Sequence, residues 1–133
     1  MITVLDLNFL SGLVMVDISV WDKVIDGYSQ MSITVDTGAT VTTISTDILH
    51  RLGYDTISGK KKRIITASSV EYVSTVTISK MKLGEIELEN IDVYAHTFPE
   101  SSFSVGVLGL NVLKNFDVSF LFSKNEIEIV SIR

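Results

Sequence analysis

Polar residues alternate with apolar ones through most of this chain of 133 residues, and this period-two pattern is the strongest constraint on its fold. Alternation of this kind places one side of an extended strand in a core and the other side in water. The two clearest apolar faces are Val14, Val16, Ile18 and Val20, and then Met31, Ile33 and Val35. Because the turn signal Asp26-Gly27 lies between them, the two segments are expected to form a hairpin that delivers Asp36 into a loop.

Further strands follow with the same period. They are expected at residues 63–66, 72–79, 86–94, 116–122 and 126–132, the last two joined by the turn Ser123-Lys124-Asn125. Helical signals are few: Ser45 or Thr46 can cap a short helix that runs through Leu52 and closes at Gly53, and another turn or two can follow Gly109. Many short strands predict an all-β sandwich or barrel, and because no boundary or repeat divides residues 1–133, a single domain is expected.

The composition excludes several classes of function. A formal net charge of -5 would repel the phosphate backbone that dominates nucleic-acid affinity, so no nucleic-acid partner is expected. The absence of cysteine excludes disulfides, thiolate metal sites and cysteine nucleophiles. The two histidines, His50 and His96, stand far apart and outside any ligand-spaced motif, so we expect ordinary surface or hydrogen-bonded roles for them and no metal site.

The sequence shows no targeting or membrane segment. Residues 1–10 carry Asp6 and have no Lys or Arg ahead of their apolar residues, unlike a signal peptide. No apolar run approaches the length of a membrane span. A soluble, cytoplasmic protein with no membrane partner is therefore expected, although a domain excised from a larger or anchored parent would have the same features.

Two conspicuous features have simple structural interpretations. The run Lys60-Lys61-Lys62-Arg63 is expected to be the solvated entry to a strand, with contact to acidic substrate residues as the alternative. Trp21 is expected to pack over the first hairpin, with the gripping of a ligand as the alternative.

The segment from Val35 to Thr40 carries the chemical signal. It places Asp36 directly after a strongly apolar strand and follows it with Thr37 and the turn residue Gly38. A carboxylate in this position would lie at a strand end, partly shielded from water. Alone, Asp-Thr-Gly is a weak signal, because Asp and Gly also mark plain turns. About 70 residues later, however, Val107-Leu108-Gly109 places two apolar residues and a glycine before a short helical turn.

Together, the two segments resemble the paired signature of retropepsin-like aspartic proteases, and the resemblance covers most of the chain, from about Leu13 to the C-terminus. It implies the fold of that family, a closed or bent barrel of strands with one or two short helices. It also implies that Val107, Leu108 and Gly109 form the crossing strand of a psi-shaped loop around Asp-Thr-Gly, where Gly109 lets the backbones pass closely. The expected order of the elements matches the family as well.

The resemblance assigns Asp36 as the catalytic residue and implies a second carboxylate. One carboxylate takes a proton from an attacking water while the other, protonated, donates to the developing oxyanion. Two carboxyls a few ångström apart share one proton and titrate as a coupled pair. The chain has a single Asp-Thr-Gly, because Asp55-Thr56-Ile57 lacks the glycine and a psi strand of its own. A homodimer is therefore expected, with one Asp36 from each copy.

Supporting roles follow from the resemblance. Thr37 would brace the two loops across the dimer axis, Gly38 would permit the tight turn, and Ala39 matches the retroviral-type alanine, where pepsin-like enzymes carry a hydroxyl that bonds the acid. The segment Ile64–Val70 takes the place of the flap that covers an extended substrate. Its substrate-binding residues would be Thr66, Ala67, Ser68 and Ser69, with the two serines where retroviral flaps carry tip glycines.

Two regions depart from the retroviral pattern. Thr40 and Leu110 stand where retroviral enzymes have an ion-paired Asp and Arg, and the double loss is coherent because losing one partner would leave a buried charge. The C-terminal hairpin, with Ile127, Ile129 and Ile132, is longer than the viral tail and resembles that of cellular and bacterial members. Part of the dimer interface is expected there, through paired edge strands.

The sequence thus predicts an aspartic endopeptidase that hydrolyses peptide or protein substrates through activated water, without metal or cofactor. An alternative stays open, namely a noncatalytic dimeric module that holds a peptide strand in the same cleft without cutting it. The intact Asp-Thr-Gly favours the enzyme, because a partly buried carboxylate opposite its own copy is costly to keep without use.

Overall fold

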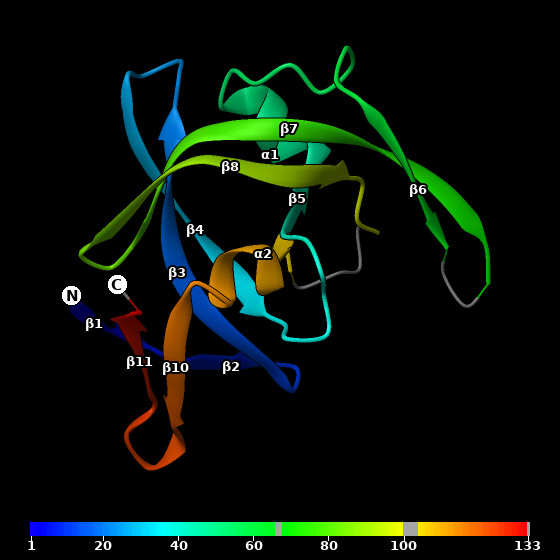
Figure 1. Ribbon diagram of the computed structural model, residues 1–133. Helices are drawn as coiled ribbons and strands as arrows, with labels where there is room; N and C mark the ends of the chain where they lie inside the picture. Colours follow the sequence, from blue (N-terminus) through cyan, green and yellow to red (C-terminus); the bar gives the residue numbers. More distant parts are fainter. Residues whose placement is uncertain (66–67, 100–103, 133) are drawn as a thin grey trace.

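The computed structural model describes residues 1–65, 68–99 and 104–132 (Figure 1). Its elements in chain order are β1 (Ile2–Asp6), β2 (Asn8–Leu10), β3 (Leu13–Asp22), β4 (Gly27–Val35), β5 (Thr43–Ser45), α1 (Thr46–Arg51), β6 (Lys61–Ile65), β7 (Val70–Leu83), β8 (Ile86–His96), β9 (Gly106–Leu108), α2 (Leu110–Leu113), β10 (Phe116–Leu121), the 3-10 helix η1 (Phe122–Lys124) and β11 (Glu126–Ser131). Strands dominate and the two α-helices of the described chain are short, so the all-β prediction is confirmed.

The predicted first hairpin is formed by β3 and β4. The two strands pair antiparallel from Met15↔Thr34 to Asp22↔Gly27, and Asp26 takes a positive φ of 54° in the turn between them. The apolar face predicted from the alternation lies in the core, where Val16, Ile18, Val20 and Ile33 are each no more than 1% exposed.

The larger sheet closes into a barrel. Its eight strands lie in the order β2-β3-β4-β9-β5-β8-β7-β6, and β3 pairs additionally with β7 through Ser19↔Lys82 and Val20↔Met81. The six strands from β3 to β7 in this order therefore form a ring, which confirms the closed barrel that the resemblance implies. Figure 1 shows that β6 and the beginning of β7 reach away from the barrel as a separate arm.

A second sheet of three strands joins the two ends of the chain. Its order is β1-β11-β10, and the backbone N–H of Ser131 donates to the carbonyl oxygen of Met1 at 2.9 Å. Strand β11 is thus paired on both sides, and Ile127 and Ile129 are each 1% exposed in the core. Strand β11 therefore has no free edge, because the unpredicted strand β1 occupies one side of it, whereas β10 pairs on one side only in the described structure. The expected dimer interface at this hairpin stays a prediction.

The helices lie close to their predicted positions. Ser45 is the N-cap of α1, although its hydroxyl makes no capping hydrogen bond, and Leu52 is the C-cap. Gly53 follows with a φ of +90°, the left-handed conformation that glycine adopts without strain. Helix α2 begins directly after Gly109, as predicted.

The barrel, both helices and the three-stranded sheet share one hydrophobic core, which runs from Leu7 to Ile129 in sequence. Trp21 packs edge-to-face on Tyr28 with ring centroids 5.3 Å apart, as its packing interpretation predicts. Lys61, Lys62 and Arg63 are exposed on β6, in agreement with a solvated strand entry. No helix of the described ranges is long and apolar enough to cross a membrane.

Candidate active site

Asp36 lies at the end of β4, where the chain leaves the barrel. Its backbone N–H donates to the carbonyl oxygen of Leu108 at 3.1 Å, so the residue is still held by the neighbouring strand β9. Its side chain is half-buried, while Thr37 and Gly38 are exposed. Oδ1 of Asp36 accepts the backbone N–H of Gly38 at 2.8 Å, and the N–H of Ala39 donates to the Asp36 carbonyl at 3.2 Å. These two bonds fix a tight turn that keeps the carboxylate beside its own backbone.

Strand β9 passes between the two arms of this loop. It pairs parallel with β4 through Thr34↔Val107 and antiparallel with β5 through Thr43↔Val107. The chain entering the Asp36 loop and the chain leaving it therefore flank one crossing strand, which is the psi-shaped arrangement that the resemblance implies. Gly109 follows the crossing strand at its closest approach, since a Cβ added there would lie 2.8 Å from the carbonyl oxygen of Ala39. Only glycine fits in that space without a shift of the backbone.

A hydrogen-bond network that the sequence analysis missed joins the loop to α2. Both the backbone N–H and the hydroxyl of Thr42 donate to Oδ1 of Asn111 at 2.8 Å, and the Thr42 oxygen accepts the N–H of Gly109 at 3.0 Å. Nδ2 of Asn111 donates to the carbonyl of Asp92 at 2.8 Å, and its backbone N–H donates to the carbonyl of Thr40 at 3.1 Å. One amide side chain thus ties the Asp36 loop, β8 and α2 together.

The network lies beside Thr40 and Leu110, the positions where the resemblance implies an ion pair in retroviral enzymes. Thr40 and Leu110 contribute backbone groups instead of charges: the N–H of Leu110 donates to the carbonyl of Ala39 at 2.8 Å, next to the bond from Asn111 to Thr40. The only sequence signal for the network is an Asn two residues after Gly109, in a position where its amide can cap the end of a neighbouring loop.

The segment expected to form the flap lies on the arm of β6 and β7. The two strands pair from Lys61↔Ser74 to Ile65↔Val70, and Ser68 and Ser69 are exposed at its end. The expected flap residues Thr66 and Ala67 lie outside the described residues.

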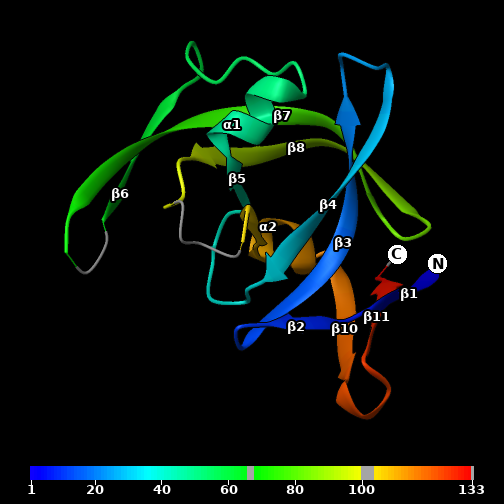
Figure 2. The same cartoon turned by 180° about the vertical axis from the view of Figure 1, so that it is seen from behind.

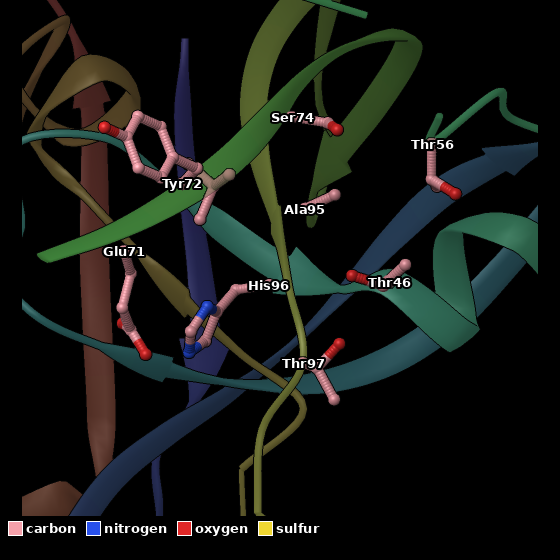
Figure 3. A pocket seen from close by; sticks show the side chains of 9 residues that line it. Thr46, Thr56, Glu71, Tyr72, Ser74, Ala95, His96 and Thr97 are labelled. Atoms are coloured by element: carbon pink, nitrogen blue, oxygen red, sulfur yellow. The ribbon is translucent and has the colours of Figure 1, made fainter. Parts of the chain in front are cut away.

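A cavity of about 470 Å³ lies at the base of this arm (Figure 3). It opens where β8 ends, because Ser74↔Ala95 is the last pair between β7 and β8. Its wall is mostly polar and comes from four segments: Thr46, Thr56, Glu71, Tyr72, Val73, Ser74, Ala95, His96 and Thr97. Figure 3 shows the carboxylate of Glu71 and the imidazole of His96 on the same side of the cavity, and Asp36 is not among the lining residues.

Sequence analysis missed this cavity because Glu71 and His96 are far apart in the chain. Glu71 and His96 come together only through the pairing of β7 with β8, and both are half-buried. The ring of His96 also packs edge-to-face on Phe98, with centroids 5.2 Å apart. A histidine expected to be an ordinary surface residue is therefore part of the cavity wall.

Asp55, the acidic residue of the second Asp-Thr dipeptide, is engaged in a turn of its own. Oδ1 of Asp55 accepts the backbone N–H groups of Ile57 and Ser58 at 2.9 and 3.0 Å, and these bonds, that of Ser58 first, lower the pKa of its carboxyl group below the ordinary value. Asp55 thus stabilises an exposed turn, in line with the absence of a second Asp-Thr-Gly. Among the residues that the structure describes, no group of three or more His, Cys, Asp or Glu could hold a metal ion.

Comparisons with known proteins identify the family and the fold. Residues 22–115 match the sequence model of the family described as gag-polyprotein putative aspartyl protease. A retropepsin-like aspartic protease from Rickettsia conorii superposes with a TM-score of 0.68 at 17% identity, over 97% of this chain and 90% of that one. The retroviral protease-like domain of Ddi1 from Leishmania major superposes with a TM-score of 0.60 at 11% identity, over 91% of this chain and 94% of that one. No curated protein matches the sequence. The predicted retropepsin-like fold is confirmed.

Proposed function

Because the chain belongs to the gag-polyprotein putative aspartyl protease family, we propose that it is an aspartic endopeptidase whose active site pairs Asp36 with the Asp36 of a second copy. The observation that carries the proposal is the position of Asp36 itself. Its carboxylate stands at a strand end, oriented by the N–H of Gly38, on a loop that is locked around β9. Such rigid support suits a group that must hold a reacting water within hydrogen-bond distance.

The chemistry needs both copies. One Asp36 carboxylate removes a proton from water as the water oxygen attacks the peptide carbonyl carbon, and the other, protonated, donates its proton to the carbonyl oxygen. The tetrahedral intermediate then breaks its C–N bond, and the leaving nitrogen receives a proton from the carboxyl that gained one. At the same time a hydroxyl of the intermediate returns a proton to the other carboxylate as the carbonyl group re-forms. No bond forms between enzyme and substrate, so the pair returns to its singly protonated state after release of the products.

The substrate binds as an extended strand in this proposal. In the described part of the arm, residues 70–73 of β7 pair only with β6, so their other backbone edge is available to a peptide. Addition of a strand to such an edge supplies main-chain hydrogen bonds, while pockets for alternate side chains supply specificity. The cavity lined by Glu71 and His96 adjoins this edge and has the size of a side-chain pocket.

A peptide-library cleavage assay on the wild type and on Asp36→Asn tests the proposal. Asn keeps the shape of the side chain but cannot accept the proton, so we expect kcat/KM to fall by a factor of about 10³ or more with an unchanged fold. Asp55→Asn is the matched control, since it removes a carboxylate from the similar tripeptide Asp55-Thr56-Ile57 and should leave activity within about twofold of the wild type. Cleavage by Asp36→Asn at the wild-type rate would refute the assignment.

A pepstatin-type inhibitor separates the enzyme from a noncatalytic peptide-binding module on the same fold. Its hydroxyl mimics the tetrahedral intermediate and should bind the working dyad of the wild type much more tightly than the Asp36→Asn variant. Peptide binding without cleavage, together with equal inhibitor affinity for the wild type and Asp36→Asn, would favour the binding module.

A further inference from the structure

An exposed aromatic surface lies at one edge of the larger sheet. The ring of Phe9 on β2 contacts that of Phe122 in η1 with centroids 6.2 Å apart, and Phe122 stacks on Phe120 at 5.8 Å. Despite these contacts, Phe9 is 52% exposed, Leu10 45% and Phe122 58%. We name Phe9, Leu10, Phe120 and Phe122 the phenylalanine patch. Contiguous apolar surface of this kind on a folded chain marks an interaction site.

The patch includes a sheet edge without the usual protection. Strand β2 pairs only with β3 in the described structure, so its outer backbone edge has no partner there. Exposed edge strands normally carry lysine, proline or a bulge that prevents pairing with another chain. All three residues of β2, Asn8, Phe9 and Leu10, are exposed and none is charged. This edge therefore favours contact with another polypeptide.

The strand register places the patch next to the Asp36 loop. Met15 on β3 pairs with Thr34 on one side and with Asn8 on the other. Because Asp36 is two residues beyond Thr34 and Leu10 two residues beyond Asn8, the two residues lie at the same end of the sheet. They are separated by two strand spacings, about 10 Å. Figures 1 and 2 both show the turn between β2 and β3 beside the loop that follows β4.

We propose that the phenylalanine patch is buried against a second copy of this chain, in the homodimer that forms the active site. The inference rests on the proposed Asp36 pair, which requires the two-fold axis to pass within a few ångström of Asp36. A standard interface buries about 800 Å² on each partner, the area of a disc with a radius of about 16 Å. Leu10, about 10 Å from Asp36, falls inside such a disc. The aromatic rings of the patch continue this apolar surface farther from the two-fold axis.

The accessible part of the C-terminal hairpin also indicates that the contact between the two copies includes the phenylalanine patch. The expected interface at the C-terminal hairpin cannot use Ile127 and Ile129, since both are buried within their own chain. The other strand of that hairpin, β10, keeps an unpaired edge among the described residues and runs directly into Phe122. The part of the C-terminal hairpin that is accessible to a partner is therefore continuous with the patch.

Sedimentation equilibrium on Phe9→Ser and Phe122→Ser tests the inference. Each variant should raise the dimer dissociation constant at least tenfold, and the activity per subunit should fall at concentrations where the dimer dissociates. Ile25→Ser is the matched control, because Ile25 is 62% exposed at the opposite end of the β3–β4 hairpin. It should change the dissociation constant by less than twofold.

A second measurement covers the case in which a serine variant fails to fold. The chain has no cysteine, so Leu10→Cys can carry the only spin label of each copy. Pulsed electron–electron double resonance should then report a distance of at most about 30 Å between the two labels. This limit is twice the distance of about 10 Å between Leu10 and Asp36, plus the separation of the two Asp36 carboxylates across the axis. A longer distance would overturn the inference.

The outcomes separate this inference from the proposed function. A wild-type dimer that stays intact and active in both serine variants overturns the patch and leaves the protease proposal in place. A patch-dependent dimer without peptidase activity supports the patch and refutes the enzyme. A wild type that is monomeric throughout, or whose patch binds lipid vesicles or an unrelated protein instead of its own copy, overturns the inference.

Discussion

The Thr42 hydroxyl donates a hydrogen bond of 2.8 Å to Oδ1 of Asn111, and this contact joins the chain leaving the Asp36 loop to helix α2. Thr42 is fully buried, and its oxygen also accepts the N–H of Gly109. Thr42→Val keeps the shape but leaves that N–H without an acceptor. We expect the free energy of unfolding to fall by about 1–3 kcal/mol, because an unpaired buried donor bears its full desolvation penalty.

Urea denaturation measures this effect, and Thr77→Val is its control. The hydroxyl of Thr77 also bonds a side-chain oxygen, that of Asp92 at 2.7 Å, but Thr77 is exposed. Its replacement should change the free energy of unfolding by no more than about 0.5 kcal/mol. If the free energy of unfolding fell equally in the two variants, the buried hydrogen bond of Thr42 would contribute no more to stability than the exposed bond of Thr77.

Gly109 provides a second prediction about the same loop. The Cβ of Gly109→Ala would meet three backbone atoms: the carbonyl oxygen of Ala39 at 2.8 Å, the carbonyl carbon of Val41 at 2.8 Å and the nitrogen of Thr42 at 2.9 Å. Because backbone cannot move aside as a side chain can, we expect a loss of about 3 kcal/mol or more. In the control Gly27→Ala, the nearest atom is 3.9 Å away and stability should stay within about 0.5 kcal/mol. A fully stable Gly109→Ala protein would contradict the close packing of the loop around β9.

Much of the barrel could be predicted because its strands follow a simple physical rule. Alternation identified the buried faces of β3 and β4, and the Asp26-Gly27 turn fixed their pairing. Strand β2 was missed because its three residues are too few to show an alternation, although its partner β3 is adjacent. Strands β1 and β5 were missed because they are short and gain their partners from distant segments. Ile2↔Val130 and Thr43↔Tyr94 are pairs of this kind, and a local pattern carries no information about them.

The candidate site was predictable to a different extent at each residue. The position of Asp36 followed from the order of apolar strand, carboxylate and glycine. The role of Asn111 did not, since an amide is informative only when its partners are known, and these lie 69 positions away at Thr42 and 19 positions away at Asp92. The wall formed by Glu71 and His96 depends equally on the pairing of β7 with β8.

Asp22 links stability to pH at the other end of the β3–β4 hairpin. Its carboxylate accepts the hydroxyl of Ser29 at 2.8 Å and the N–H groups of Val24 and Ile25 at 2.9 and 3.3 Å. These bonds, that of Ser29 first, lower its pKa below the ordinary value of 3.8 against the opposing effect of burial. Since the pKa of Asp22 is lower in the folded chain, its ionised carboxylate stabilises the fold at any pH above the pKa of the unfolded chain. This stabilisation is lost as the pH falls through the pKa of the folded chain.

Ser29→Ala should therefore lower the urea midpoint at pH 7. Below about pH 4, where the wild type loses stability as Asp22 is protonated, the midpoint of the variant should fall less steeply than that of the wild type. Urea midpoints between pH 7 and pH 2 check both parts. Ser32→Ala is the control, because the Ser32 hydroxyl donates to the exposed Asp17 at 2.9 Å and its loss should leave the acid limb unchanged. An acid limb that is the same in Ser29→Ala and the wild type would show that Asp22 does not contribute to it.

We predict that the side chain at residue 39 influences the pH range of activity in the proposed enzyme. The backbone of Ala39 is held on both sides, by its N–H to the Asp36 carbonyl at 3.2 Å and by its own carbonyl, which accepts the N–H of Leu110 at 2.8 Å. Ala39→Ser therefore changes the side chain on a fixed backbone. The new hydroxyl can donate to the Asp36 carboxylate, which in the described structure accepts a hydrogen bond from Gly38 alone. A donor to the ionised form favours that form, so both limbs of the bell-shaped dependence of kcat/KM on pH should move to lower pH.

The wild type, which lacks this donor, should accordingly work in mildly acidic to near-neutral conditions. Ala39→Gly is the matched control, since it also alters the side chain at this position but adds no hydroxyl, and its two limbs should stay at the wild-type pH values. The measurement is kcat/KM against pH for the three proteins on one peptide substrate, at concentrations where each is dimeric. A serine variant whose limbs stay in place or move toward alkaline pH would show that a hydroxyl at residue 39 does not reach the carboxylate pair, and that the acidity of the pair is set by other groups.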